Sequence, residues 1–163
     1  MFSVALIHPL FLLALLWIYF CIQFAGTMNW QALSDVGVYG LVSTAILFPA
    51  FLGDWEQFKS ASIIVSIATG IGLIGKFLID AKRPDLSGND SFPSNHTANA
   101  FAASTALMMW HGWLIGLLSY GLASLVGLGR VKAFKHHWRD VITGLAVGLI
   151  AAMVALKLFL PES

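Results

Sequence analysis

Long apolar runs constrain this chain more than any other feature of its sequence. Six of them follow one another along 163 residues, so that 58% of the chain is hydrophobic and only 10% is charged. A soluble domain carries about 25% charged residues, whereas an apolar helix of about 20 residues crosses the hydrocarbon core of a bilayer. We therefore expect an all-α, polytopic membrane protein, with six transmembrane helices in a single domain over residues 1–163.

Six predicted spans follow from the positions of these runs. They are Val4–Ala25, Val36–Gly53, Ala61–Ile79, Ser94–Trp110, Trp113–Leu128 and Asp140–Leu160. An even number of spans places both ends of the chain on one face of the membrane. The connections between spans one and two, three and four, and five and six then share the opposite face. The short fourth span is only just long enough for a hydrocarbon core of about 30 Å, and the layout depends on it.

Two polar stretches interrupt the apolar sequence, and both fall on that shared face. The first is Lys76–His96, the longest polar segment of the chain, and the second is Gly129–Asp140. Charged groups in membrane helices are costly to bury and are functional hypotheses by default. We expect the two stretches to fold onto each other and to form an anion-binding catalytic site at one membrane face.

Three cations in these stretches are candidate phosphate ligands. Arg83 and Arg130 offer a forked guanidinium group that binds phosphate through paired hydrogen bonds, and Lys76 offers a point charge. Ser94 and the backbone N–H groups that follow it lie where the predicted fourth helix begins, a position that favours an anion. The remaining cations of the two stretches are expected to be loop or lipid-contacting charges: Lys82, Lys132, Lys135 and Arg139.

Two histidines complete the parts needed for phosphoryl transfer through a covalent intermediate. His136 and Asp140 are four residues apart, so at the start of a helix they share one face and the carboxylate can fix the imidazole tautomer. His96 comes from the other stretch and can donate a proton to the leaving oxygen. His137 is three residues from Asp140, so chemistry alone does not distinguish it from His136 as the nucleophile.

The acidic residues of the first stretch allow another interpretation. Asp80, Asp85 and Asp90 could hold a magnesium ion, because carboxylates are among its preferred ligands. They lie close in sequence to three cations, however, so we interpret them as charge balance and expect no metal ion at the site.

The chain also resembles a known family, the type 2 phosphatidic acid phosphatases (the PAP2 or lipid phosphate phosphatase superfamily). The segments that match its three-part signature are Lys76-x6-Arg83-Pro84, Pro93-Ser94-Asn95-His96 and Arg130-x5-His136-x3-Asp140. The resemblance implies that His136 is the nucleophile, that Asp140 orients it and that His96 is the general acid. It also implies a phosphate site without metal or cofactor, formed by Lys76, Arg83, Ser94, Asn95 and Arg130.

Two positions depart from the family pattern. Asn95 stands where the family has glycine, so its N–H can still face the phosphate while its side chain narrows the pocket or contacts the head group. Gly129 stands where the family has the serine that precedes Arg130, so a possible hydroxyl contact to phosphate is missing.

The resemblance implies hydrolysis of a membrane lipid phosphate or pyrophosphate through a phosphohistidine. By analogy with compact bacterial members the expected substrate is undecaprenyl pyrophosphate, and the alternatives are phosphatidylglycerol phosphate, phosphatidic acid and lipid A phosphates. A lipid phosphotransferase would use the same residues, whereas a non-enzymatic transporter of anionic lipids would not need the His136–Asp140 pair. A net charge of +1 gives no support for a nucleic-acid partner, and the oligomeric state stays open.

Two indicators of membrane orientation disagree. Seven of the nine Lys and Arg residues lie on the face of the polar stretches, and the positive-inside rule would place that face in the cytoplasm. The family resemblance implies the opposite, an active site on the periplasmic or extracytoplasmic face of a bacterial inner (plasma) membrane. Because Lys76, Arg83 and Arg130 are explained by phosphate binding, we expect the extracytoplasmic placement.

Overall fold

The computed structural model describes residues 4–26 and 28–159, and this part of the chain is helical. Its helices are α1 (Val4–Ala25), α2 (Trp30–Ala45), α3 (Leu47–Phe51), α4 (Trp55–Leu78), α5 (Asn95–His111), α6 (Trp113–Lys132) and α7 (Trp138–Leu158). Within these residues, strand-like pairing is limited to an isolated bridge between Ala81 and Asp90. The predicted all-α class is confirmed.

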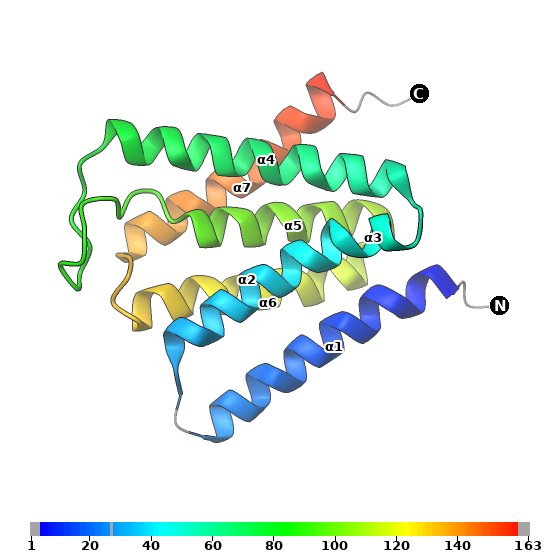
Figure 1. Ribbon diagram of the computed structural model, residues 1–163, viewed down its shortest axis with the longest axis horizontal. Coiled ribbons are helices and arrows are strands. Elements are labelled where there is room, and N and C mark those ends of the chain that lie inside the picture. Colours follow the sequence, from blue (N-terminus) through cyan, green and yellow to red (C-terminus); the bar gives the residue numbers. More distant parts are fainter. Residues whose placement is uncertain (1–3, 27, 160–163) are drawn as a thin grey trace.

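The helices form a bundle in which the functional loops gather at one end. Figure 1 shows the α4–α5 connection, the α6–α7 connection and the facing ends of α1 and α2 at that end. The α3–α4 and α5–α6 turns lie at the other end, as an even number of spans predicts. In the described part of the chain, three helices are long and apolar enough to cross a membrane: α4, α6 and α7. The count of six spans therefore stays a prediction.

The second predicted span is divided into two helices. α2 already begins at Trp30, because Asn29 caps it: Asn29 Oδ1 accepts a hydrogen bond from the Ala32 N–H at 3.0 Å. The helix is interrupted at Ile46, shortly before Pro49. Proline lacks the N–H that would bond to the carbonyl four residues earlier, and its ring clashes with that carbonyl. The prediction of one continuous span over Val36–Gly53 is therefore wrong.

Three other predicted boundaries within the described residues move by more than one residue, and each of these changes lengthens a helix at a polar segment. α4 begins at Trp55 rather than Ala61, because Asp54 caps it and accepts a hydrogen bond from the Gln57 N–H at 3.1 Å. α6 continues to Lys132 instead of ending at Leu128. α7 begins at Trp138 instead of Asp140 and ends at Leu158, while the predicted end at Leu160 lies outside the described residues. Charged and polar residues extend helices past the apolar runs that predicted them.

α5 is the central helix, packed against α2, α4, α6 and α7. Small buried residues such as Ala98 and Ala102 allow its neighbours to approach closely. On α7, a Cβ on Gly144 would lie 2.5 Å from the Ser94 carbonyl oxygen, and one on Gly148 would lie 2.5 Å from that of Ala98. Glycine at these positions brings the start of α7 beside the start of α5, which is where two of the three motifs lie.

Candidate active site

The two polar stretches fold onto each other at the loop end of the bundle. The Asp85 N–H donates to the Phe134 carbonyl at 3.0 Å, and the Ser94 N–H donates to the Asp140 carbonyl at 3.0 Å. Lys135 Nζ pairs with Asp85 Oδ2 at 2.7 Å, and this contact holds the pKa of Asp85 well below its usual range. The predicted juxtaposition of the stretches is confirmed.

His136 is a buried imidazole in the connection between α6 and α7. Its side chain is 2% exposed, and its Nδ1 donates a hydrogen bond to the Ser91 carbonyl oxygen at 2.7 Å. Because a carbonyl oxygen only accepts, the proton lies on Nδ1 and the Nε2 lone pair is free. Burial, and next the positive charge of Arg130, lower the pKa of His136 to about 4. The ring is therefore neutral at neutral pH, as a nucleophile must be.

Asp140 does not contact His136 in the way that the spacing predicted. Its Oδ2 lies 3.8 Å from His136 Nδ1, beyond hydrogen-bond distance. The carboxylate instead accepts from the Ser91 hydroxyl at 2.5 Å and from the His137 N–H at 2.8 Å. α7 starts only at Trp138, so His136 precedes the helix and the shared face of residues four apart does not apply. Asp140 thus fixes Ser91, whose carbonyl holds the imidazole.

His137 has a structural task at the start of α7. It is the N-cap, and its side chain accepts a hydrogen bond from the Asp140 backbone N–H. Its own N–H donates to the Asp140 carboxylate, which closes a reciprocal capping box. The ring is therefore engaged in capping, and this arrangement favours its neighbour His136 as the nucleophile.

His96 and Arg130 share one carboxylate, that of Asp35 on α2. Asp35 Oδ1 lies 2.9 Å from His96 Nε2 and 3.1 Å from Arg130 Nη1. The Arg130 side chain is 6% exposed, and its Nε is buried without a hydrogen-bond partner. A buried donor left unpaired is costly, and an oxygen of an incoming phosphate would satisfy it.

Asp35 and Ser91 were not among the residues predicted from the sequence. Asp35 carried a usable signal, because it is a carboxylate at the edge of an apolar run on the face of the polar stretches. Ser91 acts on His136 through its backbone carbonyl, a group that every residue has. No residue-type pattern could have identified it.

Lys76 and Arg83 both contact Asp90. Arg83 Nε and Nη2 donate to the two carboxylate oxygens at 2.8 and 2.9 Å. Lys76 Nζ donates to the Asp90 carbonyl oxygen and also lies 3.5 Å from Oδ2. The hydrogen bond from Arg83 is the main cause that lowers the pKa of Asp90 to about 2. The interpretation of Asp90 as charge balance is confirmed.

Ser94 and Asn95 lie at the start of α5. The Ser94 N–H is occupied by Asp140, while the N–H groups of Asn95 and His96 are in the first helical turn and have no intrahelical partner. The Asn95 side chain lies against α4, because a Cβ on Gly72 would be 1.7 Å from Asn95 Oδ1. That side chain fills the interface between two helices, so Asn95 offers an anion its backbone N–H.

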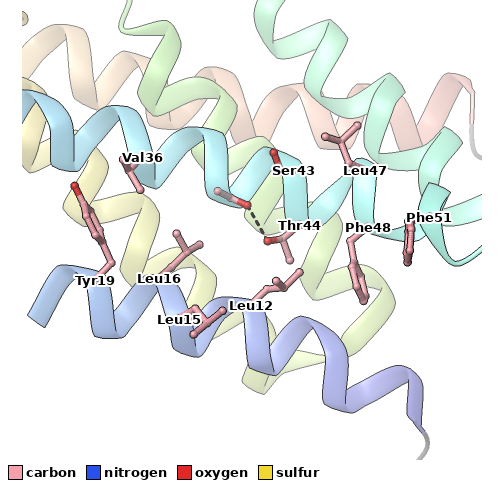
Figure 2. A pocket seen from close by; sticks show the side chains of 11 residues that line it. Leu12, Leu15, Leu16, Tyr19, Val36, Ser43, Thr44, Leu47, Phe48 and Phe51 are labelled. Atoms are coloured by element: carbon pink, nitrogen blue, oxygen red, sulfur yellow. Dashed lines mark hydrogen bonds between the residues drawn. The ribbon is translucent and has the colours of Figure 1, made fainter. Parts of the chain in front are cut away.

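A separate groove lies between α1 and the α2–α3 pair. Its volume is about 510 Å³, and it is lined by Leu12, Leu15, Leu16, Tyr19, Val36, Gly40, Ser43, Thr44, Leu47, Phe48 and Phe51. Figure 2 shows mostly apolar side chains facing each other across it, with the Thr44 hydroxyl bonded to a backbone carbonyl. The described residues that line this groove include no carboxylate, histidine or cation. It suits hydrocarbon rather than phosphate, so the candidate phosphate site is the one at the loop end of the bundle.

The helical bundle and the motif residues gathered at its end define the class of protein. The chain belongs to the PAP2 superfamily, whose family model matches residues 10–162. In structure it is similar to LpxE from Aquifex aeolicus, with a TM-score of 0.65 and 26% identity, over 86% of this chain and 93% of that one. The resemblance inferred from the three motifs is confirmed.

Curated relatives are lipid phosphatases by name. Lipid A 1-phosphatase of Porphyromonas gingivalis is 35% identical over 98 residues, which cover 54% of this chain and 22% of that protein. Phospholipid phosphatase 1 of Rattus norvegicus is 28% identical over 79% of this chain and 48% of the relative. The putative undecaprenyl-diphosphatase YbjG of Escherichia coli is 33% identical over 42% of this chain and 35% of that protein. The chain thus spans between about a fifth and a half of the length of these relatives.

Proposed function

We propose that this protein hydrolyses the terminal phosphate of a membrane lipid phosphate or pyrophosphate, through a phosphohistidine at His136 and without a metal ion. The observation that carries the proposal is the His136 ring, which is buried and neutral, with Nδ1 bonded to Ser91 and Nε2 free. A transporter of anionic lipids would need cations but not a buried imidazole with a fixed tautomer.

In the proposed complex the phosphate lies among Lys76, Arg83 and Arg130 at the N-terminus of α5. Arg130 offers its unpaired Nε, and the first helical turn offers backbone N–H groups. The Ser94 hydroxyl accepts from Thr97 at 3.0 Å, so its own proton is available to a phosphate oxygen. Fixed positive groups at this position would stabilise the charge that develops on the phosphoryl oxygens.

The reaction proceeds in two displacements. His136 Nε2 attacks phosphorus, so that an N–P bond forms while the P–O bond to the leaving group breaks. His96 protonates the leaving oxygen through Nδ1, because its Nε2 is held by Asp35. Water then attacks phosphorus, the N–P bond breaks, and His96 takes up the proton of that water. This sequence releases inorganic phosphate and restores both histidines.

The relatives support two substrates in particular. Similarity to a putative undecaprenyl-diphosphatase supports undecaprenyl pyrophosphate, and similarity to a lipid A 1-phosphatase supports a lipid A phosphate. Phosphatidylglycerol phosphate and phosphatidic acid follow. All four carry a phosphate at the end of a head group, which is the position that a site at a membrane face can reach.

Phosphate release from a panel of these four lipids, with purified protein in detergent, tests the proposal. We expect release from at least one lipid by wild type, none by His136→Ala, and unchanged release in excess EDTA. Release that is lost with EDTA and restored by magnesium would contradict the metal-free mechanism. Transfer of phosphate to an added acceptor lipid, without release to water, would indicate a phosphotransferase instead.

We also propose that the site faces the extracytoplasmic side of a bacterial inner membrane. In a Cys21→Ser background, a cysteine at exposed Ser87 should react with a membrane-impermeant thiol reagent in intact cells. A cysteine at Glu56, at the other end of α4, is the matched control and should be protected. The reverse labelling pattern would place the site in the cytoplasm, as the Lys and Arg distribution suggests.

A further inference from the structure

The carboxylate of Asp90 lies where the substrate phosphate is expected to bind. It takes both forked donors of Arg83, Nε and Nη2, at 2.8 and 2.9 Å, and it is 3.5 Å from Lys76 Nζ. The side chains of Lys76 and Arg83 are 16% and 19% exposed, so few other positions are open to an anion beside them. Two cations assigned to the substrate are therefore occupied by a group of the protein itself.

The backbone around Asp90 is held by hydrogen bonds, whereas the Asp90 side chain has room to move. Its neighbours are fixed by the hydrogen bonds Ala81 N–H to Asn89 carbonyl and Ser91 N–H to Ala81 carbonyl, each 2.9 Å. The Asp90 side chain itself is 52% exposed. A rotation about its side-chain bonds would release Arg83 without disturbing Ser91, whose carbonyl holds His136.

Charge decides which ligands can replace this carboxylate. Asp90 brings one negative charge, and its covalent attachment gives it a high effective concentration beside Arg83. A phosphodiester, the group in most membrane phospholipids, also carries one negative charge. Its attraction to the cations is therefore no stronger than that of the Asp90 carboxylate, and it does not displace this carboxylate. A phosphate monoester carries a charge of about −1.5 to −2 at pH 7, so Lys76, Arg83 and Arg130 together attract it more strongly than they attract a single carboxylate.

We propose that Asp90 is a specificity-determining residue: it fills the position between Lys76 and Arg83 in the unliganded protein, yields to a terminal phosphate, and excludes phosphodiesters. This inference rests on the proposed phosphatase function. Asp90 would thereby keep phosphodiester lipids out of the site, in a membrane where these lipids outnumber any terminally phosphorylated lipid.

Binding of two small probes, measured by calorimetry without turnover, tests the inference. Methyl phosphate represents the monoester, and dimethyl phosphate represents the diester. For wild type we expect methyl phosphate to bind and dimethyl phosphate to bind at least about 10-fold more weakly. Asp90→Asn should bind dimethyl phosphate about 10-fold more tightly than wild type. The ratio of the dissociation constants of dimethyl phosphate and methyl phosphate should therefore be smaller than in wild type.

Asp80→Asn is the matched control, because it removes the same charge from the same exposed loop and leaves the ratio as in wild type. An unchanged ratio in Asp90→Asn would overturn the inference, as would weaker binding of both probes, since Asp90 would then organise the cations for substrate. In both cases the proposed function would stand. If wild type binds neither probe, the phosphate site itself is misassigned and both proposals fail.

Discussion

Gly72 of α4 and Asn95 of α5 face each other so closely that a Cβ on Gly72 would lie 1.7 Å from Asn95 Oδ1. Asn95 occupies a position at which the PAP2 signature has glycine. In this chain the glycine at the contact is Gly72, on the facing helix. Gly72 lies about one turn before Lys76 on α4, so the packing of α4 on α5 also sets the distance between Lys76 and the start of α5.

We expect Gly72→Ala to destabilise the protein by about 1–3 kcal/mol, because the added methyl group overpacks the contact with Asn95. Asn95→Gly in the same chain should recover most of this loss. The measurement is the midpoint of thermal unfolding in detergent. Gly70→Ala is the control on the same helix, where a Cβ would meet no atom within 4 Å, and it should unfold no earlier than wild type. Failure of Asn95→Gly to recover the midpoint would contradict the assigned contact.

The neighbouring histidines should separate by activity and by stability. His136→Ala should reduce turnover by about 10⁴-fold or more with every substrate, as loss of a covalent nucleophile does. His137→Ala should keep its turnover but lose about 0.5–2 kcal/mol of stability, because an N-cap of α7 is removed. Phosphate release and thermal unfolding measure the two effects. An inactive His137→Ala beside an active His136→Ala would assign the nucleophile to His137.

The role of His96 can be tested by changing the leaving group. A lipid alkoxide needs a proton to depart, so His96→Ala should lose about 10²–10⁴-fold on a lipid monophosphate. Nitrophenolate departs unaided, so the same variant should lose far less on nitrophenyl phosphate. Asp35→Asn should show the same pattern more weakly, because Asp35 contacts the proposed acid His96. An additional loss that is equal on both substrates would come from the contact of Asp35 with Arg130 in the phosphate site. Equal losses on both substrates would assign His96 to phosphate binding.

The His136 ring should stay neutral to a lower pH than an ordinary histidine, and this should affect both activity and stability. Burial and the charge of Arg130 lower the pKa of His136 to about 4, below the ordinary value of 6.5. The neutral, reactive ring should therefore persist as the pH falls through 6.5 and should be lost only near 4. The unfolded chain binds this proton more readily, so stability should rise with pH between about 4 and 6.5. NMR titration of the ring, assigned with His136→Gln, measures the pKa, and a midpoint at 6.5 would contradict this environment.

Helix formation and family membership were determined by the sequence itself, and so was the choice of candidate site residues. Apolar runs predicted the helices because a bilayer admits only segments whose backbone groups bond internally. The spacing of Lys76 to Arg83 and of Arg130 to His136 identified the family, since these motifs are local along the chain. The errors in this part were also local: a cap at Asn29 and the proline at position 49 moved the limits of α2.

Contacts between distant segments were decided by the tertiary structure alone. Asp35 meets His96 and Arg130 only because α2, α5 and α6 pack together, and Ser91 meets His136 through a backbone carbonyl that no side-chain pattern reveals. The four-residue spacing predicts a contact between Asp140 and His136, but that rule holds only inside a helix, and α7 begins after His136. The spacing of residues along the chain predicts contacts within one helix. The hydrogen-bond partners of a candidate catalytic side chain, in contrast, depend on how other helices and loops pack against it.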